Sequence, residues 1–91
     1  MYVYILTNPG KKVLYVGVTN DLKKRVREHE KERGNSNTFA GRYYCNKLIF
    51  YEIFDDPIAA IRREKEIKNM SRQLKFELIK KRNPRLNFYR V

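Results

Sequence analysis

The pattern of hydrophobic and polar positions predicts two short strands at the start of the chain. The runs Val3 to Thr7 and Lys12 to Val18 are rich in β-branched and aromatic residues. Between them lie Asn8, Pro9 and Gly10, a combination that is typical of turns. The segment therefore predicts a β-hairpin with its turn at residues 8–11.

Two tyrosines are expected on the same face of this hairpin. With the turn at residues 8–11, Thr7 pairs with Lys12, and Tyr4 lies directly opposite Tyr15. Directly opposed residues project to the same side of a sheet, and an aromatic pair stabilises it by roughly 0.2–1 kcal/mol. The pair is either an ordinary packing contact or part of a site, and the hairpin alone does not decide between the two.

The rest of the chain combines helical patterns with one further strand. Residues that favour helix N-termini precede the helical segments, and Gly34 and Pro84 mark two of their ends. In chain order we predict a helix from Leu22 to Arg33, a polar loop from Asn35 to Gly41, a strand from Asn46 to Phe54, a helix from Pro57 to about Asn69, a helix capped by Ser71 and reaching Lys81, and an extended tail from Leu86 to Val91.

The order β-β-α-β-α-α predicts an α+β fold in which helices flank a three-stranded antiparallel sheet. The 91 residues are expected to form a single domain, residues 1–91, around one core. A single cysteine, Cys45, excludes an internal disulfide, and we interpret it as a core residue of a protein from a reducing compartment. No apolar run is long enough to span a membrane, so a cytoplasmic protein is expected.

The amino-acid composition indicates the kind of partner that the protein binds. The chain has 21 Lys and Arg against 10 Asp and Glu, which gives a formal charge of +11. Such an excess is costly in a compact protein unless a polyanion binds to it, so nucleic acid is the expected partner and DNA the first choice. Each basic cluster alone fits a solvated helix face, but their sum does not. The residues expected to contact nucleic acid are Lys23, Lys24, Arg27 and Lys47.

Charged residues interrupt the apolar stripes of two helices. At about 100° per residue, Glu64 falls between Ala60 and Ile61 on the stripe that faces the core. In the first helix, Arg25 and the only histidine, His29, also face the sheet. Each residue taken alone has a purely structural explanation. Glu64 can form a salt bridge, and His29 can be a hydrogen-bonded residue at the edge of the core. Arg25 can lay its apolar stem along the core and keep its charge in water. Together with the tyrosines they would form a polar cluster.

These side chains suit the cleavage of a phosphodiester bond. One carboxylate is enough to hold a Mg²⁺ ion that keeps its waters and binds phosphate oxygens. An arginine offers a planar fork of donors to the charge that grows on a phosphoryl group. A phenol with a pKa of about 10 is a poor base at neutral pH, so a catalytic tyrosine needs a cation that lowers its pKa.

In this ordered set of motifs the chain resembles the GIY-YIG nuclease superfamily, and most closely its small stand-alone bacterial members. The resemblance covers nearly the whole chain, and the spacing of the set is more specific than any one motif. The matching positions are Tyr2-Val3-Tyr4, Tyr15-Val16-Gly17, Arg25, His29, Glu64 and, near the C-terminus, Asn87.

The resemblance implies a three-stranded antiparallel sheet and a metal-dependent endonuclease that uses Mg²⁺ or Mn²⁺. It implies that Tyr15 activates or positions the water, that Arg25 stabilises the transition state, and that Glu64 carries the metal. Tyr4 and His29 complete the expected catalytic set, and Gly17 and Asn87 arrange it. Some members carry a lysine where this chain has Val18, so Lys47 or His29 is expected to lower the pKa of the tyrosine instead.

The leading hypothesis is therefore a DNA endonuclease that acts in repair, recombination or defence. The alternatives are a nucleic-acid-binding module without chemistry and a nuclease subunit that needs a partner protein for specificity. Only the enzyme predicts a metal-dependent activity that is lost in Glu64→Ala. Four aromatic residues are expected to pack and not to stack on unpaired bases, with Phe50 in the core; they are Tyr43, Tyr44, Phe50 and Tyr51.

Overall fold

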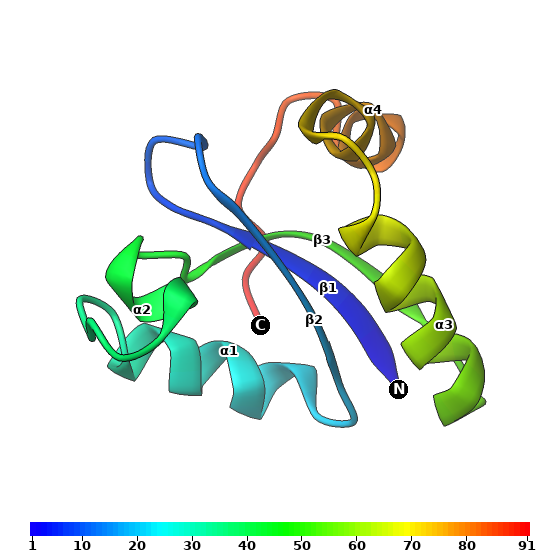
Figure 1. Ribbon diagram of the computed structural model, residues 1–91, viewed down its shortest axis with the longest axis horizontal. Coiled ribbons are helices and arrows are strands. Elements are labelled where there is room, and N and C mark those ends of the chain that lie inside the picture. Colours follow the sequence, from blue (N-terminus) through cyan, green and yellow to red (C-terminus); the bar gives the residue numbers. More distant parts are fainter.

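A three-stranded antiparallel sheet forms the centre of the computed structural model, which describes residues 1–91. The strands are β1 (Tyr2–Thr7), β2 (Leu14–Thr19) and β3 (Lys47–Ile53), and their order in the sheet is β2-β1-β3. The hydrophobic strand β1 is therefore central, with β2 and β3 at the edges (Figure 1). The predicted α+β class and the antiparallel three-stranded sheet are confirmed.

Four helices lie around this sheet, one more than predicted. Helices α3 and α4 begin where predicted and end within one residue of the predicted positions, whereas α1 ends two residues early. None of the helices combines the length and the apolar character that a membrane crossing requires. The helices are α1 (Leu22–Lys31), α2 (Phe39–Arg42), α3 (Pro57–Lys68) and α4 (Arg72–Arg82).

The short helix α2 begins inside the segment from Asn35 to Gly41 that was predicted to be a loop and ends one residue beyond it, so that prediction was wrong there. The side chain of Thr38 accepts a hydrogen bond from the amide of Gly41 and so caps the helix N-terminus. A side chain at Gly41 would overlap the backbone oxygens of Glu32 and Asn35, which means that only glycine allows this close approach. The polar composition of the segment gave no sign of this helical turn, because the turn depends on tertiary contacts.

The predicted register of the hairpin was wrong by two residues. Thr7 pairs with Leu14, and Tyr4 lies opposite Gly17 instead of Tyr15. The turn is longer than predicted because the side chain of Asn8 accepts hydrogen bonds from the amides of residues 12 and 13, at 2.8 and 3.0 Å. A shift of two residues preserves the face on which each side chain lies. Tyr4 and Tyr15 are consequently diagonal neighbours on one face, with ring centroids 6.4 Å apart.

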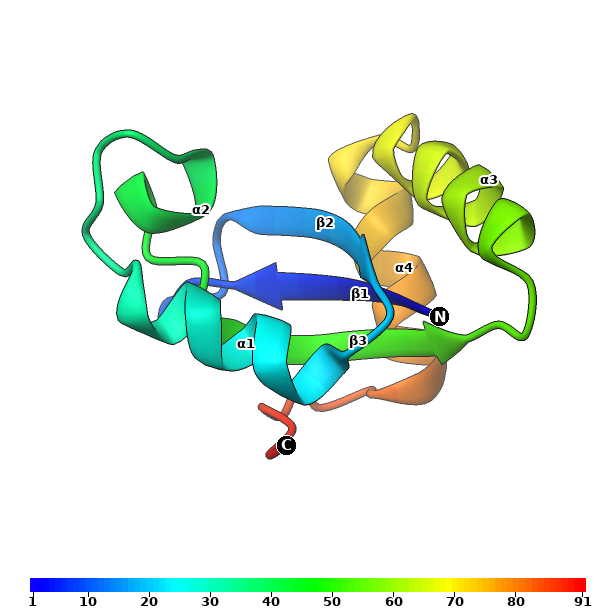
Figure 2. The ribbon, with the colours of Figure 1, turned by 90° about the horizontal axis from the view of Figure 1, so that it is seen from below.

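The two faces of the sheet carry separate hydrophobic clusters. One face packs against α3 and α4, and the other against α1 and α2 (Figure 2). The first cluster contains the buried residues Val3, Ile5, Val16, Ile49, Phe50, Ala60, Ile67 and Ile79. The second contains Tyr4, Leu6, Leu22, Ala40, Cys45 and Leu48. Cys45 and Phe50 are thus core residues, as predicted, and burial raises the pKa of the Cys45 thiol to about 11.

The outer edge of β3 is covered by the chain's C-terminal segment. The amide of Tyr89 donates to the carbonyl of Leu48 at 2.7 Å, so the predicted extended tail docks on this edge. Farther along, the buried side chain of Asn83 donates to the carbonyl of Ile49 at 2.9 Å. Covering an edge in this way removes a template for pairing with another chain.

Candidate active site

The phenol of Tyr4 lies across the backbone of the neighbouring strand β2. Tyr4 is 1% exposed, and a side-chain carbon at Gly17 would overlap its hydroxyl group. Glycine at this position therefore leaves the room in which the phenol lies. Burial, with the nearby Tyr15, raises the pKa of Tyr4 to about 12 against the opposing effect of Arg25. At neutral pH the Tyr4 hydroxyl is protonated.

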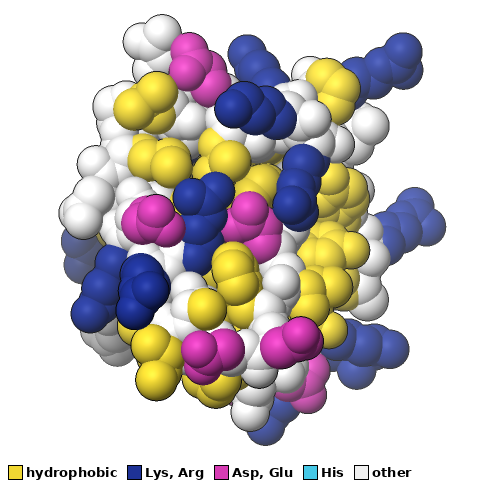
Figure 3. All heavy atoms as spheres, turned by 90° about the vertical axis from the view of Figure 1, so that its right-hand side faces the viewer, with side chains coloured by type: hydrophobic (Ala, Val, Ile, Leu, Met, Phe, Trp, Pro, Cys, Tyr) yellow, Lys and Arg dark blue, Asp and Glu magenta, His cyan; other side chains and the backbone are white.

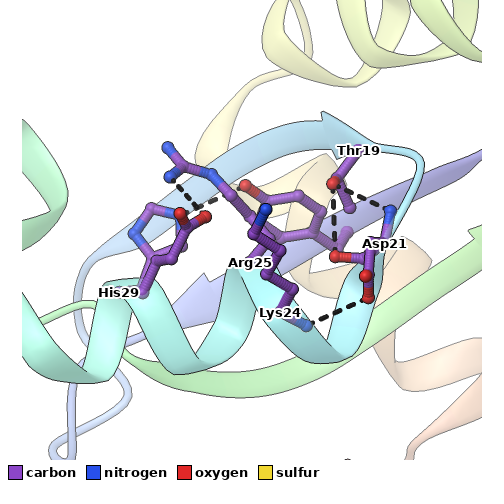
Figure 4. Close-up of polar contacts among 7 residues, drawn as sticks. Thr19, Asp21, Lys24, Arg25 and His29 are labelled. Atoms are coloured by element: carbon purple, nitrogen blue, oxygen red, sulfur yellow. Dashed lines mark hydrogen bonds and ion pairs between the residues drawn. The ribbon is translucent and has the colours of Figure 1, made fainter.

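Helix α1 brings two polar side chains to this phenol. Its N-terminus is fixed to the end of β2, since Asp21 accepts a hydrogen bond from the amide of Lys24 at 3.1 Å and its own amide donates to Thr19. Figure 4 shows that Arg25 and His29, one turn apart, extend from the same side of this helix. The capping of α1 thus determines where both side chains meet the sheet.

His29 contacts Tyr4 directly. Its Nε2 atom lies 3.1 Å from the Tyr4 hydroxyl, and the imidazole is only 3% exposed. Burial, together with the positive charge of Arg25, lowers the pKa of His29, so the ring is neutral at pH 7. Its other nitrogen, Nδ1, is buried without a hydrogen-bond partner. The neutral ring is therefore held by the contact with Tyr4.

Tyr15 and Arg25 form the accessible side of the cluster. Tyr15 is half-buried, and its ring centroid lies 5.1 Å from that of His29. The side chain of Arg25 is 35% exposed, and its guanidinium lies 3.3 Å from a carboxylate oxygen of Glu28. Tyr4, Tyr15, Arg25 and His29 thus come together on one face of the sheet, as predicted from the helix periods and the strand alternation.

Glu64 lies on α3, which covers the face of the sheet opposite to Tyr4. Its carboxylate is 14% exposed and forms an ion pair with Lys68 at 3.1 Å, so the salt bridge that was the structural alternative is present. The negative charge of Glu64 also contributes to the raised pKa of Tyr4, which places it within electrostatic reach of the phenol. The ion pair with Lys68 and the effect on the pKa of Tyr4 are compatible with each other.

A separate ion pair fixes the helix that carries Glu64. Acidic and basic side chains are interspersed on the face that α3 and α4 form (Figure 3). Arg63 of α3 donates from Nε to Glu52 of β3 at 2.9 Å, and both side chains are largely buried. The hydrogen bond raises the pKa of Arg63 and holds α3 against β3.

Comparison with known proteins identifies the family. The sequence matches the GIY-YIG catalytic domain over residues 1–83. The chain belongs to the GIY-YIG family. A UPF0213 protein of Syntrophus aciditrophicus is 37% identical over 89 residues, which are 93% of this chain and 95% of the relative. A UPF0213 protein of Haloquadratum walsbyi is 42% identical over 77 residues, covering 85% of this chain and 83% of the relative.

A solved structure shows the same fold. The solution NMR structure of a UPF0213 protein from Bacillus halodurans is similar with a TM-score of 0.58 and 31% sequence identity, over 92% of this chain and 86% of that one. The chain therefore spans most of the length of these GIY-YIG relatives. The resemblance to the small stand-alone members is confirmed.

The donor set of this GIY-YIG site fits one kind of metal ion. No three side chains of His, Cys, Asp or Glu come together as a metal site. The single carboxylate of Glu64 fits Mg²⁺ or Mn²⁺ bound partly by water and by phosphate oxygens of a substrate. Lys68 occupies the carboxylate here, so ion binding would displace an exposed lysine. Metal binding by Glu64 stays a prediction.

The predicted nucleic-acid contacts lie in two places. Lys23, Lys24 and Arg27 are exposed on α1, where they line a surface hollow of about 350 Å³. Lys47 lines a different groove, beside Arg27 and the C-terminal tail. Strand β1 stands between Lys47 and Tyr15, whereas the positive charge of Arg25 acts on Tyr4 and lowers the pKa of that phenol. The role of these cations in binding stays a prediction.

Two asparagines near the C-terminus are linked by hydrogen bonds, and the predicted site-arranging role of Asn87 stays a prediction. Asn87 is exposed, and its backbone is held by the side chain of Asn83, at 3.0 Å through Oδ1 and 2.8 Å through Nδ2. Asn83 is buried and also bonds to β3.

Sequence reasoning missed Asn83, although an asparagine directly before a proline at a helix end was a signal. It also missed Phe39, whose ring lies beside Tyr15.

Proposed function

We propose that this protein is a metal-dependent endonuclease that hydrolyses phosphodiester bonds in DNA, with residues 1–91 as a single catalytic domain. The observation that carries the proposal is the meeting of Tyr4, Tyr15, Arg25 and His29 on one face of the sheet, with Glu64 within electrostatic reach. Membership of the GIY-YIG family supports it. The net charge of +11 suits a polyanionic substrate.

The protein's own groups divide into positioning and catalytic roles. Tyr4 is protonated and bonded to His29, so it orients the site and does not act as the base. Tyr15 is the more accessible phenol and orients or deprotonates the attacking water. The partly exposed guanidinium of Arg25 donates hydrogen bonds to the phosphoryl oxygens as their charge grows. Water attacks phosphorus and gives up a proton, the bond from phosphorus to the leaving oxygen breaks, and that oxygen takes up a proton from solvent.

Glu64 would hold the divalent ion. When bound, Mg²⁺ or Mn²⁺ supplies Lewis-acid stabilisation of the charge on the phosphate and on the leaving oxygen. The ion pair with Lys68 orients the Glu64 carboxylate until the lysine is displaced. The proposal therefore gives Lys68 the role of a replaceable counter-ion.

Specificity is expected to come from the shape of the substrate or from a partner protein, because a domain of this size has little surface for reading sequence. The reducing cytoplasm, where DNA repair, recombination or defence takes place, is the proposed setting, and the unpaired thiol of Cys45 suits it.

A nucleic-acid-binding module without chemistry is the second candidate, and the ion pair of Glu64 with Lys68 favours it. In that case Glu64 is a structural residue only. A nuclease subunit that awaits a partner protein has the same site but is inactive alone.

The test is cleavage of supercoiled plasmid and of flapped or branched DNA with Mg²⁺ or Mn²⁺. We expect metal-dependent nicking by the wild type and its loss in Glu64→Ala and Tyr15→Phe. Glu66→Ala is the matched control, since Glu66 lies on the same helix and its side chain is 56% exposed. Wild-type cleavage by Glu64→Ala would overturn the assignment of Glu64. DNA binding without cleavage of any substrate would favour the binding module or the subunit.

A further inference from the structure

Two exposed aromatic rings lie directly beside the candidate active site. Phe39 of α2 is 53% exposed, and its ring is nearly parallel to that of Tyr15, at 26° and 6.4 Å between centroids. The ring of Tyr43 is 43% exposed and lies 4.8 Å from Phe39. A phenylalanine of this exposure buries little apolar surface and contributes little to the core. Its position next to a catalytic candidate calls for another explanation.

Cations surround the outer side of this phenylalanine. Phe39 lines a hollow of about 210 Å³ together with Val13 and Leu14 of the hairpin and with Arg72 and Lys75 of α4. Three segments that are distant in the chain thus place an aromatic face and two positive charges around one small space. This combination matches a nucleotide, which has a flat π-face and a negative phosphate.

The ring of Phe39 is held in place by hydrogen bonds within the loop that carries it. Gly41 packs closely on this loop. Its amide donates a hydrogen bond to the Thr38 hydroxyl at 3.0 Å, and its carbonyl accepts one from the amide of Gly34 at 2.7 Å. The position of Phe39 is therefore fixed before any ligand arrives, which lowers the entropic cost of binding.

We propose that Phe39 stacks on an unpaired base of the DNA strand next to the scissile phosphate, while Arg72 and Lys75 contact the adjoining backbone. This inference deepens the proposed function and rests on it. Bases within a duplex have both faces covered by their neighbours, so stacking on Phe39 requires an unpaired base. The substrate class is consequently DNA with a single-stranded segment at the cleavage site.

The chain contains no tryptophan, which allows a direct test. The variant Phe39→Trp carries one fluorescent reporter, and it is titrated in EDTA with an oligothymidylate and with a duplex of equal length. We expect quenching by the single strand and little by the duplex. Phe88→Trp is the control, because Phe88 is also exposed, at 39%, and lies near a cation, with Lys11 Nζ 5.1 Å from its ring. Its fluorescence should respond equally to both DNAs or to neither.

Affinity measured by anisotropy provides the second readout. Phe39→Leu keeps a similar volume but removes the π-face, and it should weaken single-strand binding by about 5- to 100-fold. Duplex affinity should change less than about twofold, and Phe39→Tyr should restore single-strand binding. Phe88→Leu should change the two affinities to the same extent, and circular dichroism verifies that each variant is folded.

The outcomes separate this inference from the function on which it rests. Selective quenching and selective loss of single-strand affinity support it. DNA cleavage by the wild type without selective quenching overturns the stacking role and leaves the nuclease intact. Binding that is equal for Phe39→Leu and wild type also overturns it. Absence of binding to either DNA overturns this inference and, with it, the proposed DNA substrate.

Discussion

The hydroxyl of Tyr4 lies 3.1 Å from Nε2 of His29, and this contact joins the central strand to helix α1 where both side chains are buried. The two residues are 25 positions apart in the chain. The hydrogen bond therefore links the geometry of the sheet to the position of α1, and through α1 to Arg25.

Removal of the Tyr4 hydroxyl should destabilise the fold. Tyr4→Phe leaves Nε2 of His29 buried without a partner, in addition to the unpartnered Nδ1. A buried polar atom that loses its partner costs about 1–3 kcal/mol. Urea denaturation should show this loss, and the matched variant Tyr51→Phe, at a surface tyrosine, should lose less than about half of it. Equal losses in the two variants would contradict the energetic role of the contact.

The stability of the protein should fall as the pH decreases from 7.0 to 5.5. The pKa of His29 is lower in the folded state than its ordinary value of 6.5, so the unfolded chain binds a proton at a pH where the folded chain does not. Stability is present above the unfolded pKa and is lost as the pH falls toward the folded pKa. Because His29 is the only histidine, thermal melts of His29→Gln should show a smaller decrease over this range. An unchanged slope would show that another group is responsible.

Gly17→Ala should displace the phenol of Tyr4. The added methyl group overlaps the hydroxyl group and the adjacent ring carbon. Since misplacement of a site by about 1 Å can cost about 100-fold in rate, we expect nuclease activity to fall by about 10- to 100-fold. Gly10→Ala is the control, because nothing lies closer than 3.8 Å to its added carbon. Full activity in Gly17→Ala would mean that the position of Tyr4 is not critical.

Three lysine and arginine residues on α1 should determine the salt dependence of DNA binding. The variant with Lys23, Lys24 and Arg27 all changed to Gln should lower the slope of log affinity against log salt by about two to three, since each phosphate contact contributes about 0.9. The control neutralises three exposed cations on α3 and α4, namely Arg62, Lys65 and Lys81. Equal slopes for the two triple variants would indicate that net charge alone matters.

Strand alternation and helix periods predicted the faces of the site correctly. The register of the hairpin was wrong, yet Tyr4 and Tyr15 still share a face because an error of two residues preserves the alternation. Arg25 and His29 likewise face the sheet because their spacing follows the helix repeat. These features depend on neighbouring residues in the chain, so local sequence is sufficient to predict them.

The sequence by itself determined the order of the main elements, the faces of their side chains, the excess positive charge and the family. Tertiary structure alone decided the distances. Asn8 set the register by closing a longer turn, Asn83 bound β3 from the end of α4, and Gly41 placed Phe39 beside Tyr15. Each of these contacts joins groups whose approach depends on side-chain hydrogen bonds or on close backbone packing. A periodic pattern predicts the face of a strand or helix on which a side chain lies, but it does not predict how closely two elements approach each other.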